Sequence, residues 1–255
     1  PSQIGGLEAI SWRIMSSVAA HIYLSPHLDD AILSCGGLIA HQAAGGESVL
    51  VVTICAGDPG EGPLSEFAQA LHALWGSGAS PVGDRRTEDR MACGRLDASV
   101  LQLDFPDAIY RRGPGGAALY TSEATLLGPL SPEETSLVQQ VAERLGSVCS
   151  EGARIYSPLA IGGHVDHRLT RAAAERLSCP MWYYRDFPYA SRTPITPSEF
   201  TPPSGRESIL ALSADEIQTW AAAVAEYRSQ ISSFWPDVYA LYQEIRAFHD
   251  QSGGV

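Results

Sequence analysis

The sequence predicts an α/β fold, namely a three-layer Rossmann-like arrangement with a mostly parallel central sheet. Short apolar runs alternate with segments of helical length between residues 21 and 187. The first four runs are apolar at nearly every position, which is typical of strands that helices cover on both faces. This alternation favours parallel strands that are joined by right-handed helical crossovers.

The expected strands and helices follow each other in a regular order. Strands are expected at residues 21–25, 48–55, 99–105, 153–161 and 181–187. Helices are expected between consecutive strands, near residues 30–44, 83–96, 133–149 and 165–178. After a proline-rich stretch at 191–205, two further helices are expected near residues 214–232 and 237–249. We expect one domain over residues 1–255, with C-terminal helices at about 206–250 packed on it.

Two long excursions leave the predicted sheet. Residues 56–82 and 106–131 are rich in Gly, Pro and Ser and contain no strong strand pattern. Loops of this length in a compact domain are often functional. We expect both to influence substrate choice, although their sequences contain no readable specificity code.

Charge excludes one class of partner. The chain has 17 Lys plus Arg against 29 Asp plus Glu, a net charge of −12, so nucleic acid would be repelled over most of the surface. A neutral, cationic or metal-assisted ligand is easier to accommodate. A homo-oligomer that forms through an apolar patch stays compatible with this acidic surface.

The cysteines and the apolar runs indicate a cytoplasmic protein. The five cysteines are widely spaced and form no CxxC pair, so we expect buried, reduced thiols. No export signal is recognisable, and no run of about 18 apolar residues predicts a membrane span.

The stretch "SPHLDD" at residues 25–30 follows the first strand. It places His27, Asp29 and Asp30 at the carboxyl edge of the sheet, where open α/β sheets bind ligands. A helix N-cap would explain one of the two aspartates, because a carboxylate there accepts a backbone N–H. It would explain neither the second aspartate nor the histidine.

A second cluster, "GGHVDHRLT" at residues 162–170, follows the fourth strand. His164 and His167 are three residues apart, as are His27 and Asp30, so each pair can share one face of a helical turn. Two imidazoles and one carboxylate are a common divalent-metal ligand set, and an open fourth position is typical of catalytic zinc. The two clusters together therefore predict a metal site.

The sequence resembles the LmbE-like, or PIG-L, zinc-dependent deacetylases, which remove the acetyl group from N-acetylglucosamine units. The resemblance rests on "SPHLDDAILSCGG" and "GGHVDH" and covers roughly residues 20–180. The chain departs from the family pattern at Leu28, where a proline is usual. It departs again at Gly162, where some members have a tyrosine.

The resemblance implies a role for each residue of the two motifs. It implies a Zn²⁺ site formed by His27, Asp30 and His167, although Fe²⁺, Co²⁺ and Ni²⁺ accept the same ligand types. It implies three catalytic residues: Asp29 as the general base, His164 facing the substrate carbonyl, and Asp166 orienting His164. A free carboxylate beside a ligating one can take a proton from metal-bound water.

The resemblance also implies that Arg85 and Asp107 contact the sugar hydroxyls, with Arg86 a close competitor of Arg85. Without it, a solvated ion pair of Arg85 with Glu88 or Asp89 on a helix surface would be preferred. The aromatic run at 182–189 is expected to be core rather than a sugar platform. The loop at 110–120, which contains two arginines, is expected to be solvated rather than a rim of the pocket.

These inferences predict a hydrolase that removes the N-acetyl group from an N-acetylglucosamine-type amino sugar or its conjugate and releases acetate. We therefore expect a small-molecule amino-sugar substrate. One alternative is a hydrolase of another amide conjugate or N-acyl chain. A second is a non-catalytic Rossmann-like nucleotide-binding or metal-storage protein. No G-x-G-x-x-G loop is present to support nucleotide binding, and a binding module would have no use for the carboxylate of Asp29.

Overall fold

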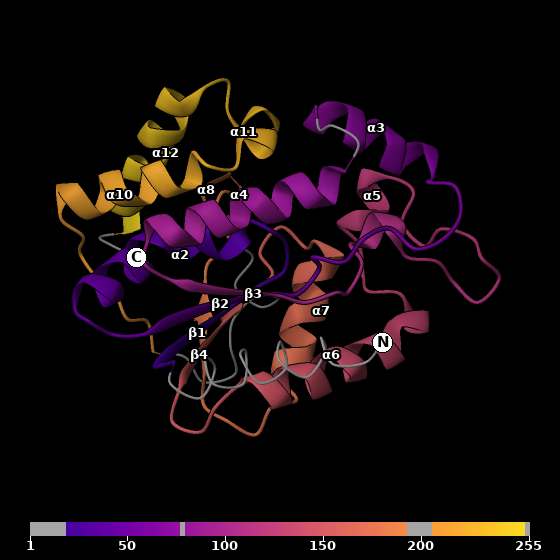
Figure 1. Cartoon of the computed structure of the whole chain (residues 1–255), viewed down its shortest axis with the longest axis horizontal. Coiled ribbons are helices and arrows are strands. Elements are labelled where there is room, and N and C mark those ends of the chain that lie inside the picture. The colour runs from indigo at the N-terminus through magenta and orange to yellow at the C-terminus, as the bar shows by residue number, and fades with distance from the viewer. Residues whose placement is uncertain (1–18, 77–79, 193–205, 253–255) are drawn as a thin grey trace, which may run out of the picture.

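The computed structural model of the chain describes residues 19–76, 80–192 and 206–252. Five parallel strands form one sheet at its centre (Figure 1). The strands are β1 (His21–Ser25), β2 (Val49–Thr53), β3 (Ser99–Gln102), β4 (Arg154–Pro158) and β5 (Met181–Tyr184). The predicted α/β fold class is therefore confirmed. Most of the proline-rich stretch, residues 193–205, lies outside the described residues.

The order of the strands, β3-β2-β1-β4-β5, places β1 between β2 and β4. The chain winds from β1 to β3 in one direction, then crosses to β4 and continues to β5 in the other. The strand order therefore reverses between β1 and β4, and ligands of open α/β sheets bind at the carboxyl ends of such strands. Both histidine clusters follow these two strands.

Helices cover both faces of the sheet (Figure 1). One face carries α2 (Asp30–Ala44) and α4 (Pro81–Arg95), and the other carries α6 (Thr135–Val148) and α7 (Val165–Ala174). The core between the sheet and α2 and α4 is called the first core, and the core between the sheet and α6 and α7 is called the second core. Side chains alternate along β1, so Tyr23 packs in the first core whereas Ile22 and Leu24 pack in the second. All three are fully buried, which explains why the strand has no polar face.

Three C-terminal helices, α10 (Ala214–Val224), α11 (Arg228–Phe234) and α12 (Val238–Ser252), extend the first core (Figure 1). The prediction of one continuous helix over 214–232 is wrong, because the chain turns at residues 225–227. The turn allows the buried Tyr227 hydroxyl to donate to Asp89 on α4 at 2.9 Å. The second predicted helix, 237–249, corresponds to α12.

The two excursions contain short helices that the sequence analysis did not predict. Helix α3 (Glu66–Trp75) lies within the first, and the second contains a 3₁₀ turn, η1 (Ala108–Tyr110), and α5 (Glu123–Leu126). Ser65 and Ser122 cap α3 and α5 with their side chains. Another 3₁₀ turn, η2 (Pro132–Glu134), precedes α6, and α8 (Tyr189–Arg192) follows β5.

All five cysteines are free thiols, as expected, but only Cys35, Cys55 and Cys93 are buried, whereas Cys149 and Cys179 are partly exposed. None of the helices in the described ranges combines the length and the apolar character that crossing a membrane requires.

Candidate active site

The turn from β1 into α2 arranges the first cluster. Ser25 caps the helix, because its Oγ accepts from the N–H of Ala31 at 3.0 Å. Asp29 occupies the N-cap position but makes no capping hydrogen bond through its side chain. Asp30 accepts from the N–H of His27 at 2.8 Å. Capping therefore does not account for Asp29, whose carboxylate is left for another role.

The turn from β4 into α7 arranges the second cluster. Ala160, Gly162 and Gly163 have φ of 64°, 89° and 79°, in the left-handed region, so the chain reverses tightly before the helix. His164 caps α7, and its Nδ1 accepts from the N–H of Asp166 at 3.2 Å. Burial lowers the pKa of His164 to about 3, so at neutral pH its ring is neutral. The ring proton then lies on Nε2, which becomes a hydrogen-bond donor.

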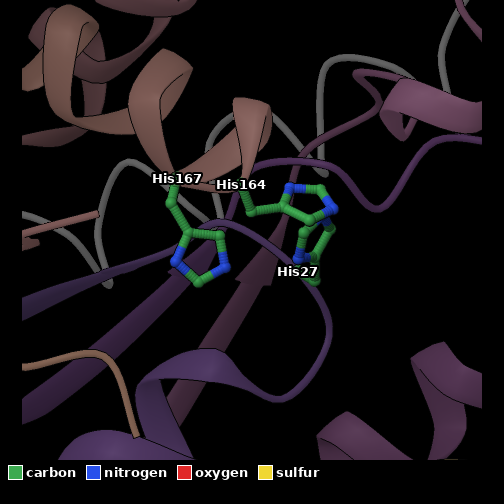
Figure 2. Close-up of side chains that lie close together, drawn as sticks. All are labelled: His27, His164 and His167. Atoms are coloured by element: carbon green, nitrogen blue, oxygen red, sulfur yellow. The ribbon is translucent and has the colours of Figure 1, made fainter. Parts of the chain in front are cut away.

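The two clusters meet because β1 and β4 are neighbours in the sheet. Figure 2 shows the rings of His27, His164 and His167 gathered at this edge. The ring centroids of His27 and His164 are 4.7 Å apart, and that of His167 is 5.5 Å from each of them. One nitrogen from each ring lies within 4.8 Å of the other two, a spacing that could hold a metal ion.

Asp30 lies between two of these histidines. Its Oδ2 is 3.0 Å from His27 Nδ1, and its Oδ1 is 3.3 Å from His167 Nε2. His167 Nε2 is fully buried yet makes no hydrogen bond of good geometry. Atoms that ligate one tetrahedral ion at 2.0–2.1 Å stand about 3.4 Å apart. The contacts of Asp30 with His27 and His167 are close to this spacing, although they use different oxygens of Asp30. The ligand atoms that lie within 4.8 Å of one another belong to His27, His164 and His167, or to His27, Asp107 and Asp166.

Asp186, which the sequence did not reveal, contacts the ring nitrogen of His167 that does not face Asp30. Its Oδ1 lies 2.6 Å from His167 Nδ1, and its Oδ2 accepts from the N–H of Ile161 at 2.9 Å. A carboxylate on the outer nitrogen of a histidine is the usual support of a metal ligand, because it fixes the tautomer and the ring orientation. Asp186 lies near the carboxyl end of the fifth predicted strand, 181–187, and follows the observed β5; this place at the same sheet edge is the signal that could have found it.

Asp29 is buried and pairs with Arg85. Its Oδ2 lies 3.5 Å from the Arg85 guanidinium. Burial, together with repulsion from Asp30, raises the pKa of Asp29 to about 6, against the opposing effect of Arg85. A carboxylate with a pKa near the working pH is suited to general-base catalysis.

Arg85 is buried, so the solvated helix-surface pair with Glu88 or Asp89 is wrong. Its guanidinium lies 4.8 Å from the Trp75 ring centroid on α3, and its Nε is buried without a hydrogen-bond partner. Arg86 points elsewhere, because its Nε donates to the carbonyl of residue 56 at 2.6 Å. This geometry favours Arg85 over Arg86 as the arginine of the site.

Asp107 and Asp166 approach His27 from the side opposite Asp30. Asp107 Oδ2 lies 3.8 Å from His27 Nε2, and Asp166 Oδ2 lies 2.9 Å from it. The carboxylate of Asp166 pairs with Arg111 as well, whereas its hydrogen bond to His164 comes from the backbone N–H. Although burial raises the pKa of Asp166, Arg111 and His27 together hold it well below the usual range. These contacts connect Asp166 to His27 more directly than to His164.

Comparison with known proteins assigns the chain to a family. The PIG-L family model, described as GlcNAc-PI de-N-acetylase, matches residues 22–178. The chain belongs to this family, which confirms the resemblance that the two motifs predicted.

Two relatives with the same name match this chain in sequence. The chain is 33% identical over 230 residues to a 2'-N-acetylparomamine deacetylase from Niallia circulans, covering 83% of this chain and 81% of that protein. It is 29% identical over 180 residues to a protein of the same name from Streptomyces fradiae, covering 67% of this chain and 58% of that one.

Solved structures agree with the fold. The zinc-inhibited form of the teicoplanin deacetylase Orf2 superposes with a TM-score of 0.79 at 30% identity, covering 90% of this chain and 91% of that one. The A40926 pseudoaglycone deacetylase Dbv21 gives a TM-score of 0.71 at 26% identity, covering 92% of this chain and 91% of the other.

Proposed function

We propose that the protein is a metal-dependent deacetylase that hydrolyses the N-acetyl group of an N-acetylglucosamine-type amino sugar and releases acetate. The observation that carries this proposal is that the adjacent residues Asp29 and Asp30 make different contacts. Asp30 lies within 3.3 Å of both His27 and His167, whereas Asp29 is buried beside them without a ligand-like contact. One carboxylate is thus placed to hold a cation and its neighbour to move a proton.

His27, Asp30 and His167 would hold the metal, which we propose to be Zn²⁺. When bound, a divalent ion in such a site polarises an amide carbonyl and acidifies water. Nε2 of His167 is buried, makes no hydrogen bond and lies 3.3 Å from Asp30 Oδ1, an arrangement that a bound cation would complete. Histidine and carboxylate ligands also suit Fe²⁺, Co²⁺ and Ni²⁺, so these metals are tested together with Zn²⁺.

The remaining side chains would act on the substrate. Asp29 would accept a proton from the attacking water and return it to the amine as the C–N bond breaks. His164 would donate from Nε2 to the oxygen that becomes negative in the transition state, an interaction worth about 3 to 4 kcal/mol for a single donor. Asp166 would keep His27 in place, and Arg85 and Asp107 would bind sugar hydroxyls.

The rim of the site favours a substrate larger than a monosaccharide. The rings of His72 and Trp75 on α3 are tilted by 33° with their centroids 5.4 Å apart, and His72 Nε2 lies 2.6 Å from the Tyr110 hydroxyl. Trp75 in turn covers Arg85. Flat side chains of this kind suit the apolar face of a second ring. The names of the relatives refer to 2'-N-acetylparomamine, teicoplanin and an A40926 pseudoaglycone, which agrees with an N-acetyl group on a larger conjugate.

The test is acetate release by the metal-free protein and by protein reloaded separately with Zn²⁺, Co²⁺, Ni²⁺ or Fe²⁺. Substrates are N-acetylglucosamine, its conjugates, and matched N-propionyl and longer N-acyl analogues. Metal-dependent acetate release, fastest with N-acetyl conjugates, supports the proposal. Faster release of a longer acid would show that the preferred substrate carries an acyl group other than acetyl. Failure to hydrolyse any of these amides with any of the metals would overturn the proposal.

Three predictions from the sequence stay predictions: a cytoplasmic location, one domain over residues 1–255, and a homo-oligomeric state.

A further inference from the structure

Two adjacent arginines in the loop at 110–120 have opposite environments. Arg111 is buried, with a side-chain exposure of 5%, although residues 112–117 of the loop are mostly exposed, as expected. Arg112 is exposed and donates to backbone carbonyls, including that of Gly116 at 2.6 Å. Burying a guanidinium is costly unless it is paired and hydrogen-bonded, so the partners of Arg111 must explain its position.

Arg111 joins two buried carboxylates. Its Nε donates to Glu134 and its NH1 to Asp166, while NH1 also lies 3.2 Å from the carbonyl of Pro106. The second oxygen of Glu134 accepts from the hydroxyl of Tyr120. Side-chain exposures are 4% for Glu134 and 0% for Asp166, so solvent screens neither pair. A planar guanidinium can bond two carboxylates at fixed angles, which a lysine ammonium cannot reproduce.

Asp166 connects Arg111 to the candidate metal centre, because it contacts both Arg111 and His27. One of its oxygens pairs with Arg111, and the other lies 2.9 Å from His27 Nε2 and accepts from the N–H of Ala108 at 2.9 Å. Asp166 therefore engages the Nε2 side of the His27 ring. The other ring nitrogen, Nδ1, is the one that lies 3.0 Å from Asp30.

We propose that Arg111 is a positioning residue of the candidate metal centre. By fixing one oxygen of Asp166, it directs the other to Nε2 of His27, and this would leave Nδ1 of His27, on the side of Asp30, free to hold a cation. Glu134 and Tyr120 hold Arg111 from the opposite side. The inference depends on the proposed metal site. It assigns to Arg111, in the loop at 110–120 and outside both histidine motifs, the positioning of a metal ligand.

The direct test is the metal affinity of Arg111→Lys, measured by competition with a chromogenic chelator for Zn²⁺ and Co²⁺. Loss of an outer-shell partner typically weakens metal binding about 10- to 100-fold, and we expect a loss in this range. The visible spectrum of the Co²⁺-loaded variant should change as well, because the orientation of His27 changes. Arg112→Lys is the matched control, and it should bind both metals as the wild type does.

A double-mutant cycle separates positioning from general destabilisation. If Arg111 acts through Asp166, then Arg111→Lys should weaken metal binding in the wild type and cause little further loss in Asp166→Asn. Independent losses that multiply would overturn the inference. The melting temperature of each chelated protein shows whether it is folded, and Arg111→Gln replaces any Arg111→Lys protein that is not.

The outcomes distinguish this inference from the proposed function. Wild-type affinity and an unchanged Co²⁺ spectrum in folded Arg111→Lys or Arg111→Gln would overturn the role of Arg111 and leave the metal site standing. A wild-type protein that binds no divalent metal would overturn both. A wild type that binds metal but releases no acetate would overturn the deacetylase proposal alone.

Discussion

Gly36→Ala should destabilise the protein by about 3 kcal/mol, because α10 packs directly against this glycine of α2. A Cβ at residue 36 would lie 2.9 Å from Trp220 Nε1 and 3.2 Å from its Cγ, and closer still to Cδ1. Trp220 has 0% exposure and donates from Nε1 to the carbonyl of Ile32 at 2.8 Å. The ring therefore cannot move aside without losing both packing and a buried hydrogen bond.

The magnitude combines opposing contributions. Overpacking costs about 1 to 3 kcal/mol, and a buried donor left without its acceptor costs about 1 to 3 kcal/mol. Replacing a helical glycine by alanine returns about 0.5 to 1 kcal/mol. The net loss of about 3 kcal/mol should lower the melting temperature by about 6 to 12 °C for a chain of this size.

Thermal and urea unfolding of the metal-free protein measure this loss, and Gly94→Ala in α4 is the control. A Cβ at Gly94 would meet nothing within 4 Å, so the control should be neutral or slightly stabilising. Gly37→Ala should fall between them, because its nearest neighbour is the end of the flexible Leu212 side chain. A Gly36→Ala protein that melts at or above the wild-type temperature would refute this packing argument.

Three further substitutions test the surroundings of the site. Asp186→Asn should weaken metal binding about tenfold in chelator competition, because His167 loses a charged partner; unchanged affinity would exclude this support. Trp75→Ala should raise KM for a conjugate but not for N-acetylglucosamine, whereas Trp75→Phe should keep the wild-type KM; equal effects on both substrates would contradict a rim that binds the scaffold. Gly162→Ala should lower kcat, because φ is 89° and a Cβ there would lie 2.8 Å from the Tyr189 ring, which packs against His167; wild-type kcat would show that the turn adapts.

The sheet could be predicted because its strands are buried on both faces. β1, for example, has no exposed residue, and its three central positions, 22–24, are all apolar. The break between α10 and α11 could not be predicted, because it depends on Tyr227 reaching Asp89, which lies 138 positions away in the sequence. Helix α3 was missed because its surroundings are rich in Gly and Pro, which concealed a short capped helix.

The site was predictable where its chemistry is local. His27 with Asp30, and His164 with His167, repeat one spacing after two strands that prove to be neighbours. Asp186 and Arg111 were missed because their roles come from contacts made across the fold. Neither belongs to a motif.

The most direct test of the central claim compares metal content and acetate release in the wild type, Asp29→Asn and Asp30→Asn. These two substitutions are the same chemical change at adjacent positions, so they isolate the division of roles. Asp29→Asn should keep the metal and lose about 10²- to 10⁴-fold in kcat, the usual contribution of a general base. Asp30→Asn should lose the metal and, with it, turnover. Retention of metal by Asp30→Asn, or kcat within tenfold of the wild type for Asp29→Asn, would contradict the account.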